Sequence, residues 1–448
     1  MGKMWVSGDE GIARKLSRRE FLKVGGAGLA GAALLGVSGC GGGQGGSGAE
    51  IVFSFFPDPS GSVQALIDRF NEENEGGAQV RLREMPADSG QHFDQLNTEF
   101  QSGEINIDVI GGDVIWPAQF AANGYIADLS DRFTEDERGA FLPAPVEANT
   151  YEGKVYGVPW YTDAGMLYYR RDLLEEAGFS EPPGTWDELK EQARTVQERA
   201  GARYGYVFQG AEYEGGVVNA LEYIWTSGGD VLEGEDRVVI DSPEARRGLG
   251  IQRSMVSEGV APEGVSQYKE QESATLFLSG EAVFMRNVPR MYALASDPAE
   301  SNIDPEQIGI AALPVAEEGL QTYSSLGGWN LFMNANARDP DAAYEFIRFM
   351  SDPEQQKFRS IEGSVLPSRQ ALYEDEDVLQ NVRVAELGQD AIRNTRPRPV
   401  SPFYSDMSLR MAEQFIQSLR GDIPPEEALA TLQGQLEEVI EQGRQQRA

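Results

Sequence analysis

Aromatic and acidic side chains stand between a proline and a glycine in the stretch from Gly157 to Gly165, which reads GVPWYTDAG. Tyr161 and Asp163 lie two residues apart there, and Trp160 precedes them. An aromatic ring offers a flat apolar surface to a sugar ring, and a carboxylate accepts hydrogen bonds from hydroxyls. Proline and glycine disfavour a helix, so we expect a strand end or a crossing segment. An edge strand with surface aromatic residues fits the pattern as well.

Asp113 is a second candidate, because it follows the buried strand expected over residues 107–110 and precedes Trp116 by three residues. The carboxyl ends of strands in open α/β sheets are where ligands bind. An acidic residue at such a position is also a good N-cap for a helix, here expected over residues 114–122. The two roles are compatible if the cap residue faces the ligand.

Trp329 follows two glycines, Gly327 and Gly328, and this is the third candidate. Glycine lets a backbone approach a ligand closely, whereas a turn with a packed tryptophan is the alternative. Near the carboxyl terminus, Arg398 lies in the run Arg-Pro-Arg-Pro, which we expect to be an extended arm that carries cations.

Apolar patterns predict the elements that position these residues. Strand-type and helical runs alternate in the order 51–56, 63–70, 80–82, 93–100 and 107–110. This order predicts a mostly parallel sheet flanked by helices, an α/β fold. A second α/β series begins near Leu167, and Thr185 with Glu188 predicts a capping box at the start of a helix with Trp186 in the core.

The amino terminus has the features of an export signal. A twin arginine, Arg18 with Arg19, precedes an apolar run over residues 24–37, and the segment Val-Ser-Gly ends at Cys40. We therefore expect residues 1–39 to be a twin-arginine lipoprotein signal peptide, with Cys40 lipidated and residues 40–50 acting as a flexible tether. An uncleaved signal anchor is the alternative, and it would also place the protein outside the cell membrane.

Composition excludes several classes of function. The formal net charge is −34, which disfavours binding to nucleic acid. Cys40 is the only cysteine, so an intrachain disulfide and a cysteine metal site are ruled out. His92 is the only histidine, and no nucleophile elbow accompanies it. We expect no catalytic residues, cofactor or metal, although a glycosidase carboxylate pair stays open on composition alone.

Several runs together carry a resemblance to a known family: residues 108–116, 156–174, 182–186, 208–215, 327–329 and 397–399. With them, the chain resembles the solute-binding lipoproteins of carbohydrate ABC importers (family 1), and among these most closely the trehalose/maltose-binding proteins. The resemblance covers Ile51 to Gln442. It implies a two-lobe periplasmic-binding-protein-like fold of type II, with a ligand cleft between lobes that crossing hinge segments join.

The resemblance also implies lobe boundaries. The amino-terminal lobe would comprise residues 51–158 with 313–362, and the carboxy-terminal lobe residues 159–312 with 363–442. Tyr161 and Asp163 would then reach the ligand from the second lobe, with the crossing at Val158 and Pro159.

By the same resemblance, five residues occupy sugar-contacting positions: Asp113, Tyr161, Asp163, Trp329 and Arg398. Trp116, Gly327 and Gly328 accompany them. A family run with two aromatic residues reads Asn-Val-Pro-Arg here, ending at Arg290, so that Trp160 or Tyr292 is a candidate replacement. His92 stands near positions where relatives carry arginine.

The implied function is capture of a di- or oligosaccharide of the trehalose/maltose type outside the cell membrane. The implied partners are the permease subunits of an ABC importer, and we expect a monomer. A secreted carbohydrate-active enzyme and a sugar sensor are the alternatives.

Overall fold

The computed structural model describes residues 49–103, 106–234 and 236–447. The predicted twin-arginine signal and Cys40, the predicted site of lipidation, lie outside these residues. Among the helices in these ranges, none combines the length and the apolar character that a membrane span requires.

The first sheet begins with the predicted alternation of strands and helices, which is confirmed. In chain order these elements are β1 (Glu50–Phe55), α2 (Ser62–Glu73), β2 (Gln79–Glu84), α3 (Ser89–Ser102) and β3 (Val109–Asp113). Strand β1 pairs in parallel with β2 and with β3. Helix α2 forms because Val63, Leu66, Ile67 and Phe70 recur at helical spacing and all are buried.

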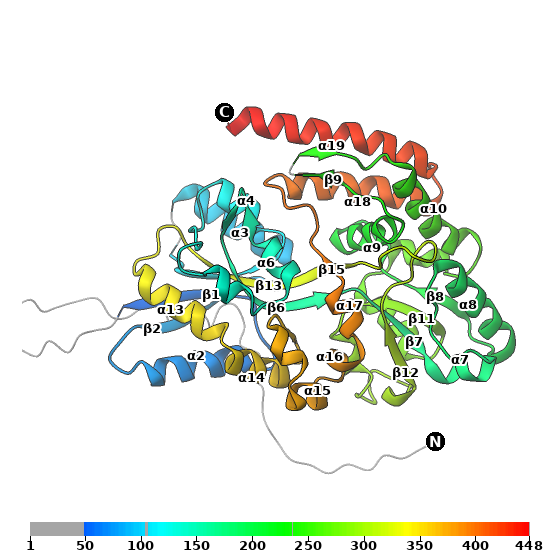
Figure 1. The fold of residues 1–448 in the computed structure, drawn as a ribbon, viewed down its shortest axis with the longest axis horizontal. Helices are drawn as coiled ribbons and strands as arrows, with labels where there is room; N and C mark the ends of the chain where they lie inside the picture. The colour runs from blue at the N-terminus through cyan, green and yellow to red at the C-terminus, as the bar shows by residue number, and fades with distance from the viewer. Residues whose placement is uncertain (1–48, 104–105, 235, 448) are drawn as a thin grey trace, which may run out of the picture. The chain divides into compact units, whose positions relative to one another are not determined.

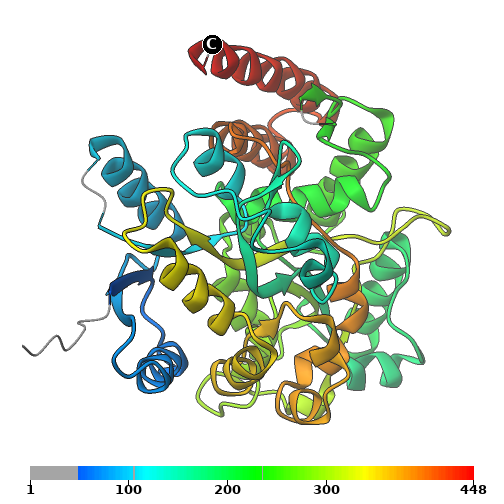
Figure 2. The same ribbon diagram turned by 60° about the vertical axis from the view of Figure 1, so that its left-hand side comes forward.

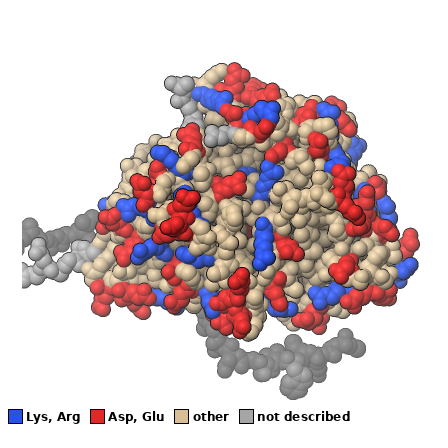
Figure 3. All heavy atoms as spheres, viewed as in Figure 1, with Lys and Arg blue, Asp and Glu red and all other residues tan. Residues whose placement is uncertain are grey.

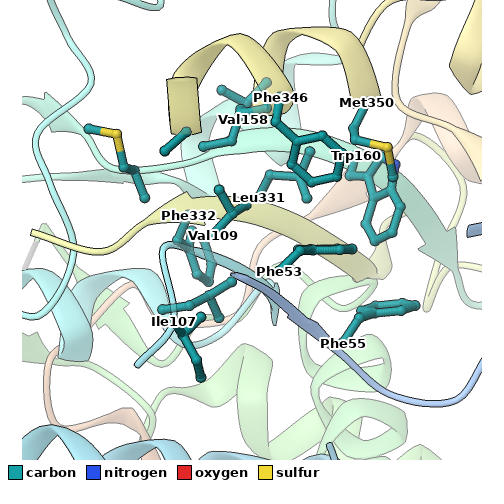
Figure 4. Close-up of a cluster of buried hydrophobic side chains, with 14 of the residues drawn as sticks. Phe53, Phe55, Ile107, Val109, Val158, Trp160, Leu331, Phe332, Phe346 and Met350 are labelled. Carbon is teal, nitrogen blue, oxygen red and sulfur yellow. The ribbon is translucent and has the colours of Figure 1, made fainter. Parts of the chain in front are cut away.

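Distant segments complete this sheet, which has seven strands in the order β14-β6-β13-β3-β1-β2, with β15 beside β13. The added strands are β6 (Val158–Ala164), β13 (Ser324–Met333), β14 (Leu366–Pro367) and β15 (Thr395–Arg396). Their apolar side chains meet those of β1 and β3 in one core, where Phe53, Trp160, Leu331 and Phe346 lie together (Figure 4).

Further elements lie around the first sheet: α4 (Pro117–Ala122), α5 (Glu135–Arg138), α6 (Pro143–Ala148), β4 (Thr150–Tyr151), β5 (Lys154–Val155), α13 (Pro340–Met350) and α14 (Pro353–Gly363). Side chains from α13, among them Phe346 and Met350, belong to the core of the first sheet.

A second sheet has four strands in the order β12-β7-β11-β8. Its strands are β7 (Met166–Arg170), β8 (Tyr204–Val207), β11 (Ala282–Asn287) and β12 (Ile308–Ala311). Helices α7 (Arg171–Ala177) and α8 (Trp186–Ala200) pack there, and Thr185 with Glu188 forms the predicted capping box. Trp186 is buried in this core, as predicted. The described chain thus forms two α/β lobes, one for each sheet (Figure 1).

The remaining elements are α9 (Glu214–Trp225), β9 (Leu232–Glu233), β10 (Arg237–Val238), α10 (Pro243–Ser257), α11 (Glu270–Leu278), α12 (Met291–Leu294), α15 (Glu376–Asn381), α16 (Arg383–Leu387), α17 (Gln389–Arg393), α18 (Tyr404–Arg420) and α19 (Pro425–Arg447), with 3-10 turns at Glu263–Gln267, Pro305–Gln307 and Gln370–Tyr373. The apolar faces of α18 and α19 pack with α9 in one core, and both views show the last two helices together (Figures 1 and 2).

The chain passes from the first sheet to the second at Gly165, between β6 and β7. This differs from the expected crossing at Val158 and Pro159, because β6 pairs with β13 from Val158 to Ala164. Pro159 is accommodated where the register shifts beside Asn330, since proline has no N–H to offer a regular ladder. Tyr161 and Asp163 therefore belong to a strand of the first sheet.

Candidate ligand-binding site

Three neighbouring strands present the predicted site residues on one face of the first sheet. The antiparallel register pairs Trp329 of β13 with Asp113 of β3 and with Tyr161 of β6. Gly327 pairs with Asp163 two positions along the same strands. Directly opposed residues share a face of a sheet. The structure therefore brings these five predicted residues together, and their role in binding stays a prediction.

The two glycines lie inside strand β13, not in a turn. A Cβ atom on Gly327 would lie 2.9 Å from Cβ of Asp163. Gly328 has φ +112°, and a Cβ there would lie 2.3 Å from the carbonyl oxygen of Tyr161. Glycine is needed at both positions because β13 and β6 approach closely. No side chain at either position covers the face that carries Asp163.

Asp113 lies at the carboxyl end of β3, as expected. Its carboxylate accepts hydrogen bonds from the Ser89 hydroxyl at 3.0 Å and the Ile115 amide at 3.3 Å. Helix α4 starts later than expected, with Trp116 at its N-cap position, so Asp113 does not cap it. Burial raises the pKa of Asp113, and the charge of Glu214 adds to this effect while Arg398 opposes it.

Asp163 has a carboxylate without a donor. None of the described residues gives it a hydrogen bond, although backbone and side chains surround it closely. Burial raises its pKa to about 7, Arg290 opposes the shift, and Asp113 adds to it. The side chain is only partly buried, so its carboxylate, which no described residue bonds, is left to solvent or a ligand. A ligand with hydroxyl groups would supply the missing hydrogen bonds.

Trp329 belongs to an aromatic cluster beside these carboxylates. Its ring centroid lies 4.8 Å from Phe56, 5.4 Å from Phe55 and 5.3 Å from Trp116. The side chain is 9% exposed, so most of its surface is used in packing. Trp116 is more deeply buried still, and it supports Trp329 edge-on.

His92 lies between these two tryptophans, with ring centroids 5.2 Å from Trp116 and 5.5 Å from Trp329. It is fully buried, and neither ring nitrogen has a hydrogen-bond partner among the described residues. Burial lowers its pKa to about 4, and the charge of Arg83 acts in the same direction. The imidazole is therefore neutral near pH 7, with one donor and one acceptor free.

Trp160 lies in the core, where packing is its role in this structure. It is 1% exposed and contacts Phe53 and Phe55 edge-on (Figure 4). The guanidinium of Arg359 covers its ring at 3.6 Å. The same guanidinium lies 4.6 Å from the ring of Tyr161, and the rings of Trp160 and Tyr161 are 5.7 Å apart, so the register shift at Trp160 keeps both rings in one cluster. Tyr292, the other candidate replacement, lies on α12 and packs against the core of the second lobe.

Arg398 connects this face to the second lobe. Its guanidinium donates to Glu214 at 2.5 Å and to the Leu326 carbonyl at 3.2 Å, and it lies 3.8 Å from the Asp113 carboxylate. Although burial opposes the charged form, Glu214 and Asp113 hold the pKa of Arg398 above its ordinary value. Glu214 also accepts from the Tyr404 hydroxyl at 2.6 Å, which ties α9 to α18.

Two residues of the site were missed by the sequence reasoning. Glu214 begins helix α9 and was not assigned a role, although an acidic residue in a first helical turn is a visible signal. Arg359 on α14 lies 4.6 Å above the ring of Tyr161, and burial lowers its pKa to about 10. No local pattern marks Arg359, because its partners lie on distant strands. No group of three or more His, Cys, Asp or Glu with metal-binding geometry occurs within residues 49–103, 106–234 and 236–447.

Comparisons with known proteins identify the family. The family model for bacterial extracellular solute-binding proteins matches residues 56–357. A probable ABC transporter-binding protein of Deinococcus radiodurans is 34% identical over 377 residues, which cover 82% of this chain and 88% of that protein. Maltose-bound MalE3 of T. maritima is 34% identical with a TM-score of 0.77, covering 87% of this chain and 100% of that one.

The GacH receptor of Streptomyces glaucescens, studied without ligand and with acarbose, is 26% identical with a TM-score of 0.75. The match covers 88% of this chain and 99% of that one. These likenesses agree with the two α/β lobes. This chain therefore belongs to the bacterial extracellular solute-binding proteins, with the two-lobe fold of periplasmic binding proteins.

Proposed function

We propose that this protein captures a di- or oligosaccharide of the trehalose/maltose type between its lobes and delivers it to an ABC importer. The observation that carries the proposal is the Asp163 carboxylate, which has no donor among the described residues. It shares a face of the sheet with Trp329 and Asp113. Sugar hydroxyls would donate to both carboxylates, and the exposed part of the tryptophan would contact a pyranose ring.

The names of relatives support an α-glucoside as ligand. MalE3 was solved with maltose and GacH with acarbose, and a maltotriose-binding protein of Pyrococcus abyssi is 26% identical over 292 residues. Gly327 and Gly328 let β13 approach β6 closely, which would hold Asp163 and Tyr161 beside Trp329.

Binding would favour the closed arrangement of the lobes. Arg398 already joins the two lobes, because it pairs with Glu214 of α9 and lies near Asp113 of β3. A sugar that contacts both lobes only when they are closed shifts the equilibrium toward that state. The permease subunits would recognise the closed state. The protein acts in this proposal as a monomer, exported by the twin-arginine pathway and anchored through lipidated Cys40.

Calorimetric titration with trehalose, maltose, sucrose and isomaltulose tests the proposal. We expect one saturable binding event for at least one α-glucoside and no product after incubation. Asp163→Asn should weaken this event, while Asp128→Asn, at a surface carboxylate paired with Lys154, should not. Absence of binding across the panel, or hydrolysis of any sugar in it, would contradict the proposal.

A further inference from the structure

A buried ion pair lies where the chain crosses between the lobes. Glu222 of α9 and Arg286 of β11 are 2% and 3% exposed, and both belong to the second lobe. The guanidinium donates to the carboxylate through Nε at 2.7 Å and through Nη2 at 2.5 Å. Gln209 accepts from Nη1 of Arg286 at 3.0 Å and donates to the Arg286 carbonyl at 2.9 Å. These bonds fix the position of the Glu222 carboxylate within the second lobe.

The first crossing segment rests on this carboxylate. Gly165 joins β6 of the first sheet to β7 of the second. A Cβ atom on Gly165 would overlap Oε1 of Glu222 and lie 2.5 Å from Nη2 of Arg286. Gly165 does not have a positive φ, so its backbone conformation alone would accept other residues. Glycine is needed at this position because the ion pair lies against the backbone.

A second crossing strand is bonded to the same carboxylate. Leu326 of β13 pairs with Ala164, so Ser325 and Gly165 are the next positions along the two strands. The Ser325 amide donates to Glu222 at 3.0 Å. The carboxylate of one residue in the second lobe therefore holds the ends of β6 and β13 at which the chain passes between the lobes.

This arrangement has the geometry of a pivot. When two lobes rotate about crossing strands, contacts at the rotation axis are kept, whereas contacts far from the axis are made and broken. The Glu222–Arg286 pair is buried and meets the crossing strands at their backbone. The Ser405 hydroxyl of α18 instead donates to the Gln119 side chain of α4 at 2.8 Å, directly from one lobe to the other. A bond of that kind breaks when the lobes separate.

We propose that the Glu222–Arg286 pair is the pivot of lobe closure and that it determines the angle between the lobes through Gly165 and Ser325. Glu222 and Arg286 are positioning residues, because they act on a ligand only through the arrangement of the lobes. The expected effect on sugar affinity rests on the proposed function. The angle between the lobes does not, because it can be measured without a ligand.

Gly165→Ala tests the pivot, because its methyl group displaces the crossing strand from the ion pair and changes no charge. We expect the sugar-free variant to have a larger radius of gyration than the wild type in X-ray solution scattering. Its affinity for maltose should fall at least tenfold in calorimetric titration. Gly205→Ala is the matched control, since its Cβ would lie 2.8 Å from Cβ of Ala193 inside the second lobe, and both quantities should stay unchanged. An unchanged radius in Gly165→Ala overturns the proposal.

A second variant removes the pair without leaving a buried charge. Glu222→Met combined with Arg286→Met takes away the acceptor of the Ser325 amide, and we expect a folded protein, checked by circular dichroism, with a larger radius of gyration than the wild type. A folded double variant with the radius of the wild type contradicts the proposal.

Hydrogen exchange in the wild type tests the pivot without any substitution. The Ser325 amide should exchange slowly both without sugar and with maltose at saturation, because a pivot keeps its bond in both arrangements. Fast exchange of this amide in the sugar-free protein shows a bond that opens with the lobes, and it overturns the proposal. If the wild type binds no maltose, the sugar-free scattering and exchange still decide about the pivot, and only the proposed function fails.

Discussion

Two carboxylates in the same sheet have opposite surroundings. Asp108 precedes β3 and accepts from the Val52 amide at 2.8 Å and from the Arg338 amide at 3.0 Å, with an ion pair to the Arg338 guanidinium. These bonds lower its pKa although burial opposes the shift. Asp163 has no such donors among the described residues, and burial raises its pKa. The first carboxylate is bonded by protein donors, and the second has none among the described residues.

The buried arginines show the same contrast. Arg286 donates to Glu222 at 2.7 Å and to Gln209 at 3.0 Å, and Glu222 also accepts from the Ser325 amide at 3.0 Å. Arg398 keeps its Nε–H without an acceptor in the described part of the chain. Figure 3 shows that on one outer face acidic and basic side chains are interspersed.

The largest expected effect concerns the buried ion pair between Glu222 and Arg286. Glu222→Ala should lower the free energy of unfolding by about 3–5 kcal/mol, because it leaves the charge of Arg286 buried and unpaired. Urea unfolding followed by circular dichroism measures this change. The double variant Glu222→Met with Arg286→Met should recover most of the loss, since neither charge then remains. A loss below about 1 kcal/mol in Glu222→Ala would contradict the view that Arg286 depends on its pairing with Glu222.

Asp163→Asn should weaken the binding of sugar. A hydrogen bond to a charged group contributes about 1.5–3 kcal/mol, so the sugar affinity should fall roughly 10- to 150-fold. The amide keeps one acceptor and cannot carry the charge. Calorimetric titration measures the affinity, with Asp128→Asn as the surface control. If Asp163→Asn and Asp128→Asn bind the sugar with equal affinity, the sugar does not contact Asp163.

The pH dependence of the free energy of unfolding should reveal the ionisation of Asp163. Its pKa of about 7 lies above the value of 3.8 for an unperturbed aspartate, so the folded state binds the proton more tightly. The stability contributed by the protonated form is complete below pH 4 and is lost as pH rises to 7. Each unit of pKa difference corresponds to about 1.4 kcal/mol. Asp163→Asn should flatten this slope in urea unfolding, and an unchanged slope would refute the assignment.

The smallest expected effect distinguishes packing from stacking at Trp160. Trp160→Phe leaves a gap in the core, so the free energy of unfolding should fall by about 1–2 kcal/mol. The affinity for sugar should stay within twofold of the wild type, because the ring is 1% exposed and packed in the core. Thermal unfolding and calorimetric titration measure the two quantities. A tenfold loss of affinity at unchanged stability would instead indicate a stacking role.

Local patterns predicted the first half of the first sheet and the start of α8. Helical spacing of Val63, Leu66 and Phe70 was visible without tertiary information, and so was the pair Thr185 with Glu188. The crossing point was predicted too early. Pro159 looked like a break, yet the bulge opposite Asn330 lets β6 continue to Ala164. That pairing partner lies far away in the chain, and no local pattern shows it.

The sequence by itself determined which side chains could contact a sugar, because it lists the carboxylates, rings and glycines and resembles a family that supplies their roles. The tertiary structure decided which of them are open. Trp160 and Tyr161 are neighbours in the chain and both belong to the core, yet the register shift beside Asn330 leaves Trp160 without a partner on β13 while Tyr161 pairs with Trp329. Asp108 and Asp163 are the same residue type, and only the donors that folding brings to each separate a structural carboxylate from a candidate for ligand binding.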